Sequence, residues 1–106
     1  MKLTVPERLK LLEIMPEKST FAGVKDIHMT NLLLNLTGDE ADEVEAKFEG
    51  DRMFWNQEKA LGLLVDIPMG EWMTNTIRLV LREMDHEGEL EAAEITLFEK
   101  FIMDYE

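Results

Sequence analysis

Two histidines are the residues of this chain best suited to acid–base chemistry, because an imidazole titrates near neutral pH. His28 stands between Ile27 and Met29 in a stretch with helical spacing. A general base needs an orienting partner, and no carboxylate stands three or four residues from His28, where a helix would bring one alongside. The nearest acid, Asp26, is two residues away and faces elsewhere. We therefore expect a partly exposed helical histidine and not a catalytic base.

The second histidine, His86, lies in an acidic stretch that resembles a calcium-binding loop, Asp85-His86-Glu87-Gly88-Glu89-Leu90-Glu91. A calcium hand needs glycine at position six of its loop and glutamate at position twelve. Counted from Asp85, these positions hold Leu90 and Thr96, so the pattern fails. The acids suit the end of one helix, a turn and the start of the next helix. We expect no metal site here.

Other catalytic or cofactor chemistry finds no support in the residue types or their spacing. The chain has no cysteine, which removes disulfides, thiolate zinc sites and thiol nucleophiles. Gly62, Gly70 and the other glycines stand alone, without the lysine spacing of a phosphate-binding loop. Paired acids such as Asp42-Glu43 are plentiful, so no pair is singled out as a hydrolytic dyad. We expect no catalytic residue, no cofactor and no enzymatic activity.

An apolar cluster is the most distinctive group of side chains. Met53, Phe54 and Trp55 are consecutive, and in a strand Phe54 cannot share a face with its two neighbours. One face would pack on helices and the other would meet solvent or a partner, unless a loop or helix covers both. Aromatic residues and methionine are enriched at protein interfaces, and tryptophan at their hot spots. We expect Met53, Phe54, Trp55 and Trp72 to form an interaction surface.

The charge is strongly negative and unevenly distributed. The net charge is −12, whereas residues 1–36 carry five bases and four acids, so the excess of acid lies in residues 37–106. Such a surface repels phosphate backbones and anionic membranes. It can serve solubility alone. Alternatively, the acidic segment 39–45 could mimic DNA and inhibit a host DNA-binding or defence protein, although Arg78, Arg82 and Lys100 interrupt the acids farther along the chain.

Helices are expected first, because their caps can be recognised locally. Thr4 with Glu7 forms a potential capping box, and Met15-Pro16 ends the helix that follows. Ser19-Thr20 can cap a second helix, and Thr37 with Glu40 can start a short third one. In the second helix the run Leu32-Leu33-Leu34 is apolar all round. A helix of this kind is usually buried, so we expect both of its sides to be covered.

Strands are expected in the middle of the chain and helices again after them. Residues 44–48 alternate, Gly50-Asp51 is a turn signal, and residues 52–55 favour a strand, which together predict a hairpin. Alternation over residues 61–67 predicts a third strand. A long helix is expected from Pro68 to Gly88 and a last one over 90–103. The 106 residues thus predict one α+β domain with N-terminal helices, a three-stranded antiparallel meander, and two C-terminal helices packed on one sheet face.

Three segments of the chain resemble a group of small phage and prophage proteins that has no assigned activity. They are Leu3-Thr4-Val5-Pro6-Glu7-Arg8-Leu9, Asp66-Ile67-Pro68-Met69-Gly70-Glu71 and Ile95-Thr96-Leu97-Phe98-Glu99-Lys100-Phe101. The resemblance implies a viral origin and a cytoplasmic setting in a bacterial host. It transfers no functional residue.

Together these observations predict a non-enzymatic phage or prophage accessory or assembly protein that acts through protein–protein contacts. Its partner would be a host or phage protein, or a second copy in a homodimer that covers a sheet edge or an exposed aromatic face. We expect no direct contact with nucleic acid. No run of about 20 apolar residues is present to span a membrane, and residues 1–4 lead straight into a charged helix, so we expect neither a membrane span nor a signal peptide.

Overall fold

The fold combines helices with two small antiparallel strand pairs, which confirms the α+β class. The computed structural model describes residues 1–103. Its strands are β1 (Lys2–Leu3), β2 (Lys47–Glu49), β3 (Arg52–Phe54) and β4 (Val65–Asp66). Its α-helices are α1 (Val5–Ile14), α2 (Phe21–Leu34), α3 (Gly38–Glu43), α4 (Gln57–Gly62), α5 (Glu71–His86) and α6 (Ile95–Phe98). A 3-10 turn, η1 (Ala92–Glu94), precedes α6, and a π-helical turn, η2 (Glu99–Met103), follows it.

The helix starts expected from local capping chemistry are confirmed. At the start of α1, the Thr4 hydroxyl accepts from the Glu7 backbone N–H at 3.3 Å, and the Glu7 carboxylate accepts from the Thr4 N–H at 2.9 Å. Thr20 caps α2 by accepting from the N–H of Gly23. Thr37 forms the same reciprocal box at the start of α3. Each cap satisfies N–H groups that have no partner inside their own helix.

The predicted three-stranded meander is wrong. β2 and β3 do form the expected hairpin, with Gly50 in the left-handed region at φ 62°. The predicted third strand, 61–67, begins inside α4, and only Val65–Asp66 forms a strand. This short strand pairs with β1 and not with the hairpin. Asn56 caps α4, and the segment after it holds good helix formers, so helix prevails over the apolar alternation. The C-terminal helices therefore have no common three-stranded sheet to pack on.

The C-terminal helices are present with shifted ends. α5 begins at Glu71, with Gly70 as its N-cap, so Pro68 lies in the extended link before the helix and does not open it. Gly88, at φ 70°, follows the end of α5 as expected of a helix stop. The last helix was expected over 90–103. The structure has a helical run over 92–103 that passes from 3-10 to α to π geometry.

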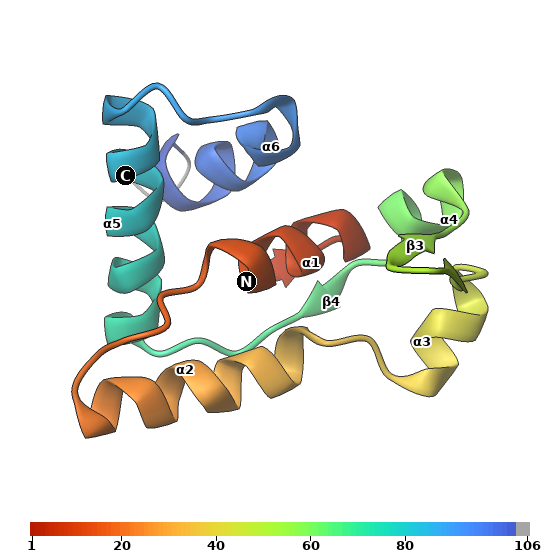
Figure 1. The fold of residues 1–106 in the computed structure, drawn as a ribbon, viewed down its shortest axis with the longest axis horizontal. Helices are drawn as coiled ribbons and strands as arrows, with labels where there is room; N and C mark the ends of the chain where they lie inside the picture. Colours follow the sequence, from red (N-terminus) through yellow and green to blue (C-terminus); the bar gives the residue numbers. More distant parts are fainter. Residues whose placement is uncertain (104–106) are drawn as a thin grey trace.

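The core lies around α1. Figure 1 shows α1 between α2 and the C-terminal helical run, with α5 at one end and the hairpin at the other. The larger group of buried apolar residues comprises Leu3, Leu11, Met15, Ile27, Leu34, Ile67, Met73, Ile77, Leu81, Leu97, Phe101 and Ile102. A smaller group, Val5, Val44 and Ala60, lies at the hairpin end and packs against Leu9, Leu36, Ala46, Trp55 and Leu63. This small core fixes the hairpin and α4 to the rest of the molecule.

The prediction that both sides of α2 are covered is wrong. Its buried residues form one stripe, which consists of Gly23, Ile27, Thr30 and Leu34. On the other side, Phe21, Met29 and Leu32 are 86%, 53% and 57% exposed. Figure 1 shows α2 along one edge of the molecule, with α1 on its inner side. The helix therefore carries more apolar surface than this fold buries.

Candidate functional site

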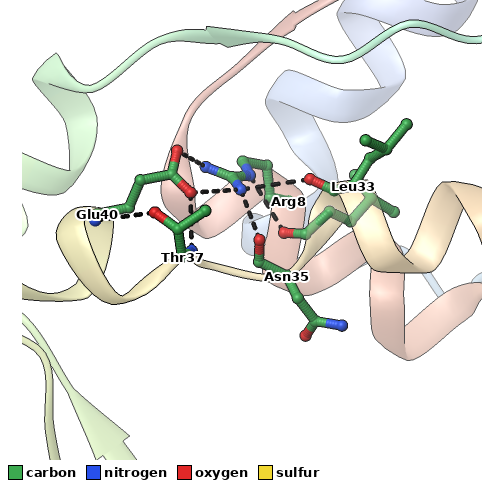
Figure 2. Close-up of polar contacts among 6 residues, drawn as sticks. Arg8, Leu33, Asn35, Thr37 and Glu40 are labelled. Atoms are coloured by element: carbon green, nitrogen blue, oxygen red, sulfur yellow. Dashed lines mark hydrogen bonds and ion pairs between the residues drawn. The ribbon is translucent and has the colours of Figure 1, made fainter.

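The most elaborate polar cluster surrounds Arg8, whose side chain is 1% exposed. Its Nε donates to the Leu34 carbonyl at 3.1 Å, and its Nη2 donates to the carbonyls of Asn35 at 2.8 Å and Leu33 at 3.4 Å. The guanidinium also binds both carboxylate oxygens of Glu40, at 2.8 and 3.0 Å (Figure 2). Arg8 therefore joins α1 to the end of α2 and the start of α3.

This arginine is occupied and does not form a ligand site. The five bonds involve all three guanidinium nitrogens, with one bond from Nε, one from Nη1 and three that share the two N–H groups of Nη2. The hydrogen bond from Arg8 is the main cause that lowers the pKa of Glu40, and it outweighs the opposing effect of burial. The Thr37 backbone N–H adds to the lowering. The cluster closes the C-terminal end of α2, whose carbonyls lack partners within the helix.

Two more buried carboxylates connect α1 to the C-terminal helical run. Burial opposes the charge of Glu7, but hydrogen bonds from Lys100 and from the Thr4 backbone hold its pKa below the ordinary value. The Lys100 Nζ lies 2.7 Å from Glu7 Oε1. Glu94 is 2% exposed, its Oε1 lies 3.7 Å from Lys10 Nζ, and its Oε2 has no hydrogen-bond partner. Neither carboxylate lines any of the hollows described below, so both are part of the packing between helices.

The structure places His28 nearer to acids than the sequence indicated. Its side chain is exposed and borders a hollow of about 330 Å³ between the end of α1 and α2, which Glu13 and Glu17 also line. These acids are far from His28 in the sequence, so helical spacing did not reveal them. Within residues 1–103 no hydrogen bond joins His28 to either acid, and Glu13 instead binds Lys10 at 2.9 Å. The histidine therefore lacks the oriented partner that a general base needs.

The acidic stretch around His86 forms the end of α5 and the turn after it. His86 is the last residue of that helix and is exposed. Across residues 1–103, no group of three or more His, Cys, Asp or Glu side chains is placed to hold a metal ion. In the same part of the chain, no helix is both long enough and apolar enough to cross a membrane.

An apolar groove beside the hairpin is the best-formed candidate site. It has a volume of about 380 Å³ and is formed by α1, the link from α2 to α3, α3 and the hairpin. Its lining consists of Leu9, Asn35, Leu36, Ala41, Ala46, Phe48 and Met53. Phe48 pairs with Met53 in the hairpin register, so both side chains lie on the face that lines the groove. Phe48 is 75% exposed. Such exposure is unusual for an aromatic side chain unless a partner covers it.

The four residues predicted to interact fall in two places. Met53, Phe54 and Trp55 border a second hollow of about 420 Å³, which shares Leu9 and Met53 with the groove. Phe54 is 49% exposed, whereas Trp55 packs on the small core and donates its indole N–H to Gln57 at 3.0 Å. Trp72 lies apart, in the first turn of α5 and close to α2 at Gly23. The interaction role of these residues stays a prediction.

Phe48 and Leu36 are groove residues that the sequence analysis did not single out. The alternation over residues 44–48 indicates that Phe48 shares a face with Val44 and Ala46, but it does not say which face is exposed. Residues 9, 36 and 48 meet only through tertiary packing, so no local spacing could have predicted the groove.

The elements that form the groove are rich in acid. The acidic residues of α3, the hairpin and the link between them are Asp39, Glu40, Asp42, Glu43, Glu45, Glu49 and Asp51. Glu45 is bound by Asn56 at 3.0 Å and by Lys59 at 3.4 Å, and these contacts lower its pKa. The same elements also carry two bases, Lys47 and Arg52, so an apolar lining is combined with elements that hold an excess of acid.

Comparison with known proteins adds no assignment to this description. No protein family model, curated protein or solved structure matches the chain. The resemblance to small phage and prophage proteins therefore stays a prediction, and the function is argued from the groove and its charge.

Proposed function

We propose that this protein is a non-enzymatic accessory or assembly protein of a phage or prophage, and that it works by holding another protein in the groove beside the hairpin. One observation carries the proposal: a hollow of about 380 Å³ has six apolar residues and a single polar one, Asn35, in its lining. Hollows that serve as ligand sites have volumes of roughly 300 to 1,000 Å³. This one is at the small end of the range and suits one or two apolar side chains of a partner.

The composition of the lining favours binding over catalysis. Catalysis requires converging polar groups that reach the reacting atoms, and Asn35 is the groove's one polar lining residue. Arg8, a buried basic residue that donates to the Asn35 carbonyl, is bound by backbone carbonyls and by Glu40. Exposed aromatic residues next to an apolar hollow are typical of sites where a partner's anchor residue is buried.

The acids around the groove indicate the chemistry of the partner. A segment with one large apolar anchor flanked by lysine or arginine would place its anchor between Phe48 and Leu36. Its charges would then face the acids of α3 and the hairpin. Complementary charge raises the association rate and excludes acidic competitors.

The test is capture of partner proteins by the tagged chain from extracts of bacterial cells, followed by binding measurements with the captured protein. Ala41→Phe fills the groove while keeping it apolar, and Phe48→Gln removes the exposed aromatic side chain. The matched control is Leu61→Gln, a change at a 52% exposed residue of α4 outside the groove. We expect both groove variants to weaken binding at least tenfold and the control to leave it unchanged. Capture that is insensitive to both groove variants contradicts the proposal.

The acidic-inhibitor alternative keeps one specific observation in its favour, the concentration of negative charge after residue 36. An inhibitor that mimics DNA would bind through charge, so its affinity would fall steeply between about 50 and 200 mM salt. Binding through the groove should weaken much less over that change in salt, because only the flanking charges are screened and burial of apolar surface is not. Steep salt dependence together with insensitivity to Ala41→Phe would favour the inhibitor.

A further inference from the structure

The outer face of α2 is an apolar surface distinct from the groove. It consists of Phe21, Val24, Met29, Leu32 and Leu33, which are 86%, 42%, 53%, 57% and 45% exposed. By helical spacing, Phe21, Met29 and Leu32 lie on the side opposite the buried stripe, and Val24 and Leu33 lie on its two flanks. An exposed leucine alone needs no explanation, but five neighbouring large apolar residues form a patch of the kind that marks an interface.

Charge distinguishes this face from the rest of the protein. The whole chain carries −12, whereas α2 holds one basic residue, Lys25, and one acidic residue, Asp26. A second copy of this chain, with the same negative charge, would be repelled at the acidic surfaces of α3 and the hairpin. At α2 it would meet a face with no net charge. The face is therefore well suited to contact between two copies.

The distribution of apolar residues along α2 also fits a two-fold contact. Phe21 and Val24 lie near one end, Leu32 and Leu33 near the other, and Met29 lies close to the middle. In an antiparallel pair of α2 helices, each end of one copy would lie against the opposite end of the other. Apolar groups would then meet apolar groups toward both ends of the contact, as a self-complementary interface requires, while Lys25 and His28 lie between them.

The apolar area exposed on the outer face of α2 sets the expected affinity of the dimer. If a large apolar side chain exposes roughly 150 to 250 Å² in full, the fractions above add to about 500 Å² on each copy. A standard stable interface buries about 800 Å² per partner. We therefore expect an association at the weak end, with a dissociation constant on the order of micromolar.

We propose that two copies of this chain pair through the outer faces of their α2 helices, antiparallel, about a two-fold axis near the middle of the helix, between Ile27 and Met29. The proposal goes beyond the proposed function, because it concerns another surface and another partner. The groove stays open to a different protein in such a dimer if its contacts do not include α2.

Sedimentation velocity across roughly 1 to 200 μM protein tests the pairing, a range that brackets a micromolar dissociation constant. Leu32→Gln places a polar group with good helix propensity on the outer face of α2. Leu79→Gln is the control, because Leu79 is a 69% exposed leucine on a different helix, α5. We expect a monomer–dimer equilibrium for the wild type and the control, and at least tenfold weaker dimerisation for Leu32→Gln. A wild-type chain that stays monomeric throughout, or a dimer that Leu32→Gln leaves intact, overturns the proposal.

The absence of cysteine in the chain allows the orientation to be tested separately, since an introduced cysteine is unique. Met29→Cys would place the two thiols close to the axis, where a disulfide can form. Phe21→Cys would place them roughly 20 Å apart in an antiparallel pair, far beyond the reach of a disulfide. We expect oxidation to link Met29→Cys into dimers and to leave Phe21→Cys unlinked. Efficient linking of Phe21→Cys overturns the antiparallel arrangement.

The results also separate this inference from the proposed function. Leu32→Gln acts on self-association and Ala41→Phe acts on the groove, so each variant serves as the control for the other surface. A monomeric chain that still captures a partner through the groove would refute the α2 pairing alone.

Discussion

Replacing Arg8 with methionine tests whether the joint between α1, α2 and α3 depends on this buried guanidinium. Methionine keeps the length of the side chain but removes the charge and all five hydrogen bonds. Loss of one member of a buried ion pair typically costs about 3 to 5 kcal/mol, because its partner is left unpaired. The Glu40 side chain is 17% exposed and can regain some water, so we expect the lower end, about 3 kcal/mol.

That loss is large for a domain of this size, whose free energy of unfolding is expected to be roughly 5 to 15 kcal/mol. It corresponds to a fall in melting temperature of roughly 15 °C. Urea denaturation followed by circular dichroism and tryptophan fluorescence measures it, with the slope of unfolding expected to stay constant. Arg52→Met, at an exposed arginine of the hairpin, is the control and should change the free energy of unfolding by at most about 0.5 kcal/mol.

The pairing with Glu40 can be isolated by a double-mutant cycle. Glu40→Gln keeps an oxygen for the Thr37 cap but loses the negative charge facing Arg8. We expect the two single changes to be strongly non-additive, with a coupling energy of about 1 to 3 kcal/mol. A loss below about 1 kcal/mol for Arg8→Met, or additive effects in the cycle, would refute the argument that this cluster fixes the joint.

Three further predictions concern the other carboxylates and the exposed histidine. Glu7→Gln should lower the free energy of unfolding by about 1 to 2 kcal/mol, because the charged bond to Lys100 is lost. Glu94→Gln should change the free energy of unfolding by less than about 1 kcal/mol, since one Glu94 oxygen has no partner and Lys10 lies 3.7 Å from the other. Urea denaturation of both variants compares the two losses. Equal losses would contradict the difference in contacts between Glu7 and Glu94. Because the pKa values of Glu7 and Glu40 are lowered in the folded state, their stabilisation is complete above the ordinary carboxyl pKa of about 4.3 and is lost as the pH falls through the folded values. Urea midpoints between pH 7 and 3 should therefore fall less steeply for Glu40→Gln than for the wild type, and parallel curves would show that Glu40 does not contribute. Finally, His28→Gln should leave partner capture unchanged. A loss of capture comparable to that of Ala41→Phe would indicate that the partner binds in the hollow between α1 and α2.

Features fixed by local chemistry could be predicted from the sequence. Thr4 and Thr37 each have a glutamate three residues later, and both reciprocal caps form as expected. The turn at Gly50 was predicted because its conformation suits glycine and needs no distant contact. Such features depend on residues a few positions apart, so the linear order of the chain contains the necessary information.

The features that failed depend on distant contacts. The alternating residues 61–67 fit a strand, but Val65 needed a pairing partner, and that partner is Leu3, near the start of the chain. Apolar residues all round α2 indicated burial on both sides, yet the rest of the fold covers one side. The groove could not be predicted either, because its lining comes from α1, the α2–α3 link, α3 and the hairpin. Sequence patterning indicated that large apolar groups were available, and only the tertiary arrangement shows where they gather.

The Arg8 cluster has a consequence for recognition. Asn35, whose carbonyl Arg8 binds at 2.8 Å, also lines the groove, and Leu36 follows it directly. The guanidinium thus holds one wall of the groove in place before any partner arrives, so little loop ordering is left to oppose association. A substitution at Arg8 should loosen that wall and slow the capture of a partner that never touches the arginine itself.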